Sequence, residues 1–115
     1  YPGHWGLFGG HVEPGESPAD AVQRELEEEI SWAPLAPLQL WFSDDSGTRT
    51  AHVFRGALTV PLEQLKLREG QDLKLASLEE LCSETIWSDH CQELRPIAPG
   101  LSIVMRRLLS EMDDA

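Results

Sequence analysis

The sequence predicts an α/β (α+β) fold, and three features lead to this prediction. A helix with a strong start signal covers 17–30, where apolar residues recur at helical spacing. Two strand-like segments, 38–42 and 48–60, flank the turn sequence SDDSG. A second amphipathic helix covers 99–112. We expect a single domain over 1–115, because a chain of 115 residues supports one modest core.

Composition and charge exclude several classes of partner. The formal net charge of −11 leaves no basic patch to neutralise phosphates, so we expect no binding to nucleic acid or to an anionic membrane. No apolar run reaches the roughly 18–20 residues that cross a bilayer. Cys82 and Cys91 have neither zinc-site spacing nor a disulfide-rich context, which favours reduced thiols and a cytoplasmic protein. The sequence gives no indication of the oligomeric state.

The helix at 17–30 begins with a capped first turn. The Ser17 hydroxyl can accept from an unpaired backbone N–H, Pro18 suits the first helical position, and Asp20 suits the positive field there. This combination predicts the start of the helix independently of its apolar pattern. The residues expected on the apolar face are Ala19, Val22, Leu26 and Ile30.

The glutamates of this helix separate onto two sides. With Val22 at zero and about 100° per residue, Glu25, Glu28 and Glu29 fall at roughly 240–340°. Glu27 falls near 140°, on the opposite side. Like charges at these spacings repel, and a hard divalent cation would offset the repulsion. We therefore predict that the first three bind metal and that Glu27 faces solvent. The alternative is a solvated acidic face.

The segment 10–32 resembles the Nudix box. In that motif Gly, five residues, Glu and seven residues precede Arg-Glu-apolar-x-Glu-Glu-x-Gly-apolar. Ser31 stands where the family has glycine, and we expect this departure to affect only the end of the helix. The matching residues at the right spacing are Gly10, Glu16, Arg24, Glu25, Leu26, Glu28, Glu29 and Trp32.

The resemblance implies a Nudix-type α/β/α sandwich with a mixed sheet, from which the strand that usually precedes the box is missing here. It also implies that the carbonyl of Gly10 binds metal. Glu16 and Arg24 would pair across the loop and the helix, in an orienting role. The alternative for Arg24 is an exposed ion pair with Glu28 at i+4.

A loop glutamate outside the box is a further candidate. Glu69, in the sequence REGQ, resembles the region of MutT-type enzymes where a glutamate reaches the metal site from a loop. The alternative is a solvated glutamate. The resemblance thus implies Mg²⁺, with Mn²⁺ as an alternative, bound by Gly10 and by Glu25, Glu28, Glu29 and Glu69. One of the carboxylates of Glu28, Glu29 and Glu69 would deprotonate the attacking water.

The implied reaction is hydrolysis of a pyrophosphate bond in a nucleoside diphosphate linked to another group. The REGQ order favours a MutT-like (d)NTP pyrophosphatase. The alternatives are an ADP-ribose or nucleotide-sugar pyrophosphatase and a non-catalytic nucleotide-binding Nudix module. Against a MutT-like enzyme, the asparagine that reads the base in MutT has no counterpart near Ala98 and Pro99.

Four residues are candidates for contacts to the nucleotide. Trp5 and Phe42 could stack on a base, and core packing is the alternative for both. His11 follows Gly10 and could meet a phosphate, with a structural or surface histidine as the alternative. Arg55 could also bind phosphate, with an exposed strand charge as the alternative.

Shorter elements complete the prediction. We expect strands at 5–8 and 73–75, a short connection or helical turn at 61–67, and a helical turn capped by Ser77.

Overall fold

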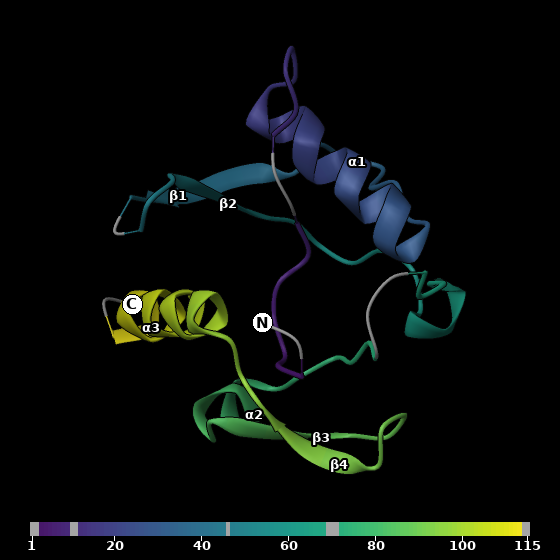
Figure 1. Cartoon of the computed structure of the whole chain (residues 1–115), viewed down its shortest axis with the longest axis vertical. Coiled ribbons are helices and arrows are strands. Elements are labelled where there is room, and N and C mark those ends of the chain that lie inside the picture. The colour runs from purple at the N-terminus through teal and green to yellow at the C-terminus, as the bar shows by residue number, and fades with distance from the viewer. Residues whose placement is uncertain (1–2, 10–11, 46, 69–71, 114–115) are drawn as a thin grey trace. The chain divides into compact units, whose positions relative to one another are not determined.

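The computed structural model describes residues 3–9, 12–45, 47–68 and 72–113, with the exception of the side chain of 113. These residues combine helices and short strands, so the predicted α+β class is confirmed (Figure 1). The chain divides into two compact units, which are described separately below. One comprises Phe8–Gly70, and the other comprises Tyr1–Leu7 together with Gln71–Ala115.

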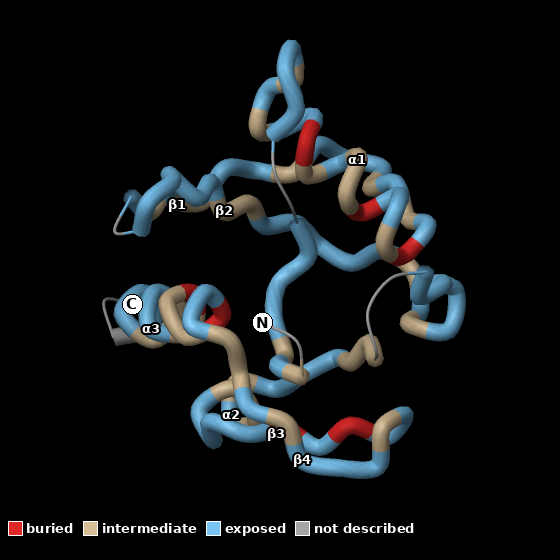
Figure 2. The backbone as a smooth tube through the Cα atoms, viewed as in Figure 1, coloured by how far each residue is buried: buried red, intermediate tan, exposed pale blue. Residues whose placement is uncertain are grey.

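Helix α1, Pro18–Ile30, is the main element of the Phe8–Gly70 unit. Its predicted cap is confirmed, because the Ser17 hydroxyl accepts from the backbone N–H of Asp20 at 3.1 Å. The residues buried along α1 are Ala21, Leu26 and Ile30 (Figure 2). Ala19, expected on the apolar face, is instead exposed in the first turn. The helix ends at Ser31, whose φ of 54° and ψ of 40° are left-handed.

An antiparallel hairpin follows α1 in the same unit. Strand β1, Gln39–Asp44, pairs with β2, Ala51–Arg55, and the register shifts between Leu40 and Phe42. β1 overlaps the expected segment 38–42, whereas β2 covers only 51–55 of the expected 48–60. Although its sequence is apolar, β1 is not a buried strand. Its residues are exposed or half-buried, because only one partner strand pairs with it. The expected helical turn appears as the short 3-10 helix η1, Leu62–Gln64.

The second unit contains two helices and a second hairpin. Helix α2, Leu78–Cys82, has the predicted cap at Ser77, completed by Glu80. Strands β3, Thr85–Ser88, and β4, Glu93–Pro96, pair antiparallel and lead into α3, Pro99–Asp113. The buried apolar side chains of this unit are Ile86, Leu101 and Val104.

Two expected strands differ from the structure, and one hairpin was missed. The segment 73–75 is not a strand, and 5–8 contributes only an isolated parallel bridge between Trp5 and Ile97. The hairpin of β3 and β4 was not expected. Within the described residues the strands form two separate two-stranded antiparallel sheets. The bridge between Trp5 and Ile97 is parallel and lies outside the named strands. None of the described helices has the length and apolar character needed to cross a membrane.

Candidate active site

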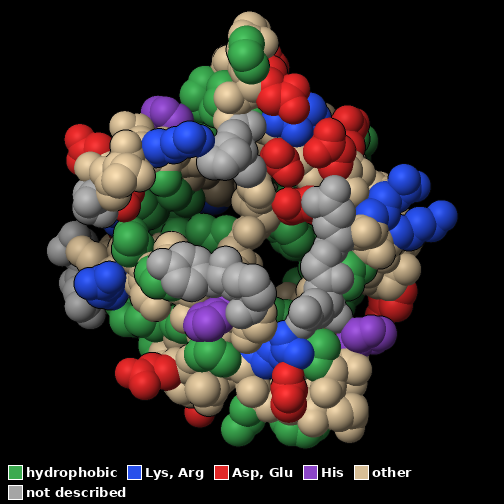
Figure 3. Space-filling view, in the orientation of Figure 1, with side chains coloured by type: hydrophobic (Ala, Val, Ile, Leu, Met, Phe, Trp, Pro, Cys, Tyr) green, Lys and Arg blue, Asp and Glu red, His purple; other side chains and the backbone are tan. Residues whose placement is uncertain are grey.

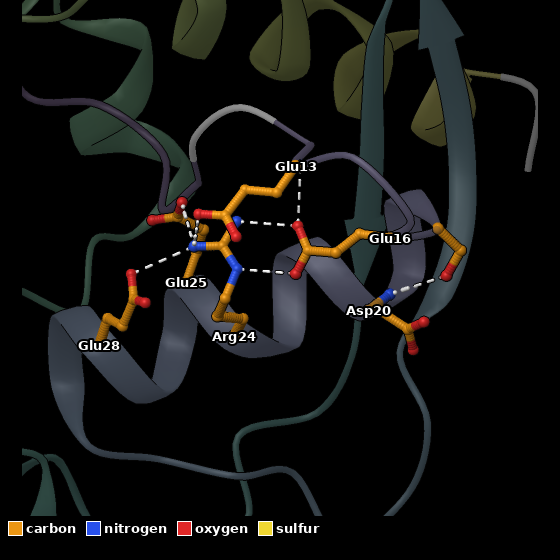
Figure 4. Close-up of polar contacts among 7 residues, drawn as sticks. Glu13, Glu16, Asp20, Arg24, Glu25 and Glu28 are labelled. Atoms are coloured by element: carbon orange, nitrogen blue, oxygen red, sulfur yellow. Dashed lines mark hydrogen bonds and ion pairs between the residues drawn. The ribbon is translucent and has the colours of Figure 1, made fainter.

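A two-point ion pair ties the loop before α1 to the middle of the helix (Figure 4). Arg24 Nε donates to Glu16 Oε2 at 2.7 Å, and Arg24 Nη2 donates to Glu16 Oε1 at 3.0 Å. The loop is closed by the N–H of Glu16, which donates to the Glu13 carbonyl at 3.0 Å. The N–H of Glu13 in turn donates to Glu16 Oε1 at 2.9 Å. The pairing expected between Glu16 and Arg24 is therefore present in the structure.

The third nitrogen of the same guanidinium gathers further carboxylates. Arg24 Nη1 donates to Glu25 Oε1 at 3.1 Å and to Glu28 Oε2 at 3.2 Å. Glu13 Oε1 lies 3.8 Å from Nη1. Arg24 thus has both contacts that were weighed for it, one to Glu16 and one to Glu28. On the face shown in Figure 3, acidic side chains gather over α1 around a basic one.

These contacts favour the ionised forms of Glu16 and Arg24. Hydrogen bonds from Arg24 and from the N–H of Glu13 hold the pKa of Glu16 below its ordinary value. The hydrogen bond to Glu16 raises the pKa of Arg24, which stays a cation. The exposed fraction of the side chain is 18% for Glu16 and 13% for Glu25, against 50% for Glu28. Among the three acids that accept hydrogen bonds from the Arg24 guanidinium, Glu28 is therefore the most exposed.

The C-terminal end of α1 is bonded to a later part of the chain. The carbonyls of Glu29 and Ile30 accept from the N–H groups of Arg68 at 2.8 Å and Lys66 at 3.1 Å. Glu29 itself is half-buried, whereas Glu27 is exposed as expected. Glu69 follows this bonded segment in the sequence. It lies outside the described residues, as do Gly10 and His11.

Comparison with known proteins identifies the family. The sequence profile of the NUDIX domain matches residues 1–95. The chain belongs to the Nudix family. Curated relatives include nucleoside triphosphatase NudI of Escherichia coli O1:K1 / APEC, of strain HS (O9:H4) and of strain SMS-3-5 / SECEC, each 46% identical over 52 residues. The match covers 44% of this chain and only 37% of the length of each of these relatives. No solved structure matches the chain.

The carboxylates of the Nudix box fit a hard divalent cation in their chemistry. Oxygens of Glu25 and Glu28 both lie within 3.2 Å of one positive nitrogen, so they already converge on a single charge. Mg²⁺ and Mn²⁺ take such oxygen ligands. Among the described residues, however, no group of three His, Cys, Asp or Glu side chains is arranged to hold a metal ion.

Two of the expected nucleotide contacts lie on the hairpin that follows the Nudix box. Phe42 packs edge-on against Trp41, with ring centroids 5.2 Å apart, and Arg55 Cζ lies 4.8 Å from the centroid of the Trp41 ring. Trp41, like Phe42, could stack on a base from the sequence alone, with core packing as the alternative. Trp5 belongs to the other unit, where its indole N–H donates to the Ile86 carbonyl at 2.9 Å. That contact favours the packing alternative for Trp5.

Sequence reasoning missed one member of the cluster, Glu13. The available signal was the turn sequence EPGE, because closure of such a turn brings its first and last residues, Glu13 and Glu16, together.

A surface hollow of about 240 Å³ also lies beside Arg24, on another side of α1. Its lining residues are Asp20, Gln23, Arg24, Glu27, Ala33 and Pro34.

Proposed function

We propose that this Nudix chain carries the catalytic centre of a Mg²⁺-dependent hydrolase that cleaves a pyrophosphate bond of a nucleoside triphosphate. The observation that carries the proposal is the cluster on the box helix, where Arg24 gathers the carboxylates of Glu16, Glu25 and Glu28. The names of the curated relatives support a nucleoside triphosphate as the substrate class. We also propose that 1–115 forms a single Nudix domain, because the family match runs through parts of both units.

The proposed reaction is a substitution at phosphorus. Water adds to one phosphorus atom, the P–O bond of the phosphoanhydride breaks, and a proton of the water passes to a carboxylate. A bound Mg²⁺ would neutralise the charge on the bridging and leaving oxygens. Its proposed ligands are Glu25, Glu28 and Glu29, together with Gly10 and Glu69. The candidates for the base are Glu28 and Glu29, whose carboxylates lie in the second half of the box, and Glu69, which the resemblance to MutT-type enzymes adds.

The test of the site compares neighbouring glutamates of one helix. Glu28→Gln and Glu29→Gln should each lower turnover at least about a hundredfold, the scale of losing an acid–base group or a ligand. Glu27→Gln is the matched control, because Glu27 carries the same charge on the exposed side of α1. It should leave turnover within about twofold of wild type. Rates close to wild type for both Glu28→Gln and Glu29→Gln would show that the site is elsewhere.

The substrate class is tested separately. The chain is incubated with Mg²⁺ and a panel of dNTPs, NTPs, ADP-ribose, nucleotide sugars and NADH, and the products are identified. We expect a nucleoside monophosphate and pyrophosphate from a triphosphate. Faster cleavage of ADP-ribose or of a nucleotide sugar would favour those alternatives. Binding without any product would indicate a nucleotide-binding Nudix module.

A further inference from the structure

The segment that follows η1 is bonded to the last residues of the box helix. The N–H of Lys66 donates to the Ile30 carbonyl at 3.1 Å, and the N–H of Arg68 donates to the Glu29 carbonyl at 2.8 Å. Ile30 is only 1% exposed, so the segment is attached at a buried point of α1. An extended chain directs alternate N–H groups to one side and alternate side chains to one face. We therefore expect the side chains of Lys66 and Arg68 to share a face.

These two cations have no acidic partner. Both residues are exposed, and within the described part of the chain no ion pair or hydrogen bond holds the side chain of either. The chain has 20 acidic and only 9 basic residues, so carboxylates are plentiful and an unpaired cation needs a reason. Arg24, in the same unit, is by contrast bonded twice to Glu16. Figure 3 shows basic side chains beside the acidic ones at the C-terminal end of α1. Lys66 and Arg68 are therefore available to an anion from outside the chain.

The place of the two cations in the fold favours phosphate as that anion. Glu28 and Glu29, the residues proposed to act on the phosphoanhydride, lie in the last turn of α1, to which the segment is bonded. A triphosphate cleaved there has further charged phosphates close by. An arginine matches two oxygens of a phosphate, and a lysine supplies a compact charge with three donors.

We infer that Lys66 and Arg68 form the binding site for the terminal phosphates of the nucleoside triphosphate. The inference rests on the proposed function and deepens it, because it assigns the residues that recognise a triphosphate tail. Two cations are enough for one such tail, whereas a nucleic acid requires a broad basic surface. The competing role is structural. The last turn of α1 carries no basic residue, so Lys66 and Arg68 would offset the negative end of the helix dipole.

Calorimetric titration of the full chain with inorganic tripolyphosphate, in EDTA and at low ionic strength, tests the site without any hydrolysis. Lys66→Ala and Arg68→Ala should each raise the Kd about tenfold, the scale of one hydrogen bond to a charged group. The double variant should raise it about a hundredfold. Arg106→Ala is the control, because it removes the same charge at an exposed position of α3. Its Kd should stay within about twofold of wild type.

The outcomes distinguish this inference from the proposed function. Wild-type affinity in both alanine variants, an equal loss in Arg106→Ala, or no binding of tripolyphosphate by the wild-type chain overturns the inference. Hydrolysis of the nucleotide panel then decides the proposed function independently. If tripolyphosphate binding depends on Lys66 and Arg68 but no nucleotide is cleaved, the phosphate site is upheld and the proposed function is overturned.

A second measurement separates phosphate binding from the structural role. Alanine keeps the backbone N–H groups of 66 and 68, so the segment stays bonded to α1 in both variants. We expect the thermal midpoint of the ligand-free chain to be nearly unchanged, and its increase on adding tripolyphosphate to be smaller than in wild type. A lowered ligand-free midpoint with a wild-type increase would mean that the two cations only stabilise the helix end.

Discussion

Arg24 and Glu16 are joined at two points, Nε to Oε2 at 2.7 Å and Nη2 to Oε1 at 3.0 Å. A planar guanidinium group matches the two oxygens of a carboxylate in this way, and an ammonium group does not. The contact leaves Nη1 as the nitrogen directed at Glu25 and Glu28. The two-point contact with Glu16 therefore determines which nitrogen of Arg24 donates to the other carboxylates of the Nudix box.

Arg24→Lys should lower kcat/KM although the charge is kept. Lysine can hold one oxygen of Glu16 but cannot hold both and also reach Glu25 and Glu28. We expect a loss of about tenfold to a hundredfold, the range for residues that orient ligands. The measurement is hydrolysis of the best triphosphate of the panel. Arg106→Lys, at an exposed position of α3, is the control and should keep wild-type kcat/KM. Equal rates for the two variants would contradict an orienting role for Arg24.

The ion pair of Glu16 should also make stability depend on pH in the acid range. Hydrogen bonds from Arg24 and the N–H of Glu13 lower the pKa of Glu16 in the folded chain from 4.5. The pKa of Glu16 is lower in the folded chain than in the unfolded chain. Its contribution to stability is therefore complete above pH 4.5 and is lost as the pH falls through the folded pKa. In urea unfolding, Glu16→Gln should be less stable than wild type at neutral pH, and the difference should shrink on acidification. With Glu63→Gln, an exposed control, no such convergence is expected.

Ser31→Gly should stabilise the chain. Ser31 ends α1 with a left-handed backbone, φ 54° and ψ 40°, which glycine adopts without the steric cost of a Cβ atom. We expect a gain of about 1 kcal/mol in the free energy of unfolding. The same substitution at a right-handed helical position should have the opposite sign, so Ser110→Gly, in the last turn of α3, is the control, with a loss of up to about 0.5–1 kcal/mol. A loss at Ser31 would mean that its side chain contributes more than its backbone costs.

The parts of the fold and site that could be predicted depend on local signals. The cap at Ser17 follows from residues within one helical turn, and the separation of Glu27 from the other glutamates of α1 follows from helical spacing. The contact of Glu16 with Arg24 spans eight positions, and the spacing of the Nudix box supplied it. The turn sequence EPGE gives a signal that Glu13 lies near Glu16, but it does not show that Glu13 also reaches Arg24, because that depends on how the turn closes.

The hairpin of β3 and β4 shows why other elements were missed. In β3 the alternation places Ile86 and Ser88 on the buried side, and a serine there breaks the apolar pattern that predicts a strand. The burial of Ser88 is possible because its hydroxyl donates to Asp72 Oδ2 at 2.6 Å. Asp72 is 16 positions away in the sequence, so this compensation is invisible to local patterns.

Ser88→Ala should destabilise the chain strongly for so small a change. Ser88 is 0% exposed, and its Oγ both donates to Asp72 and accepts from the N–H of Cys91 at 3.0 Å. Alanine removes both hydrogen bonds. The carboxylate of Asp72 and the N–H of Cys91 each lose a partner, and water does not replace it at this buried position. We expect a loss of about 1–3 kcal/mol in the free energy of unfolding, measured with urea.

A control and a second measurement identify the cause of that loss. Ser110→Ala, at an exposed position of α3, should change the stability by less than about 0.5 kcal/mol. Burial acts to raise the pKa of Asp72, but the hydrogen bonds from Ser88, Leu73 and His90 outweigh it, so its pKa lies below 3.8. Ser88→Ala removes one of these donors and should move the pKa of Asp72 upward, as followed by NMR of its carboxyl carbon. An unchanged pKa together with lost stability would assign the effect to packing alone.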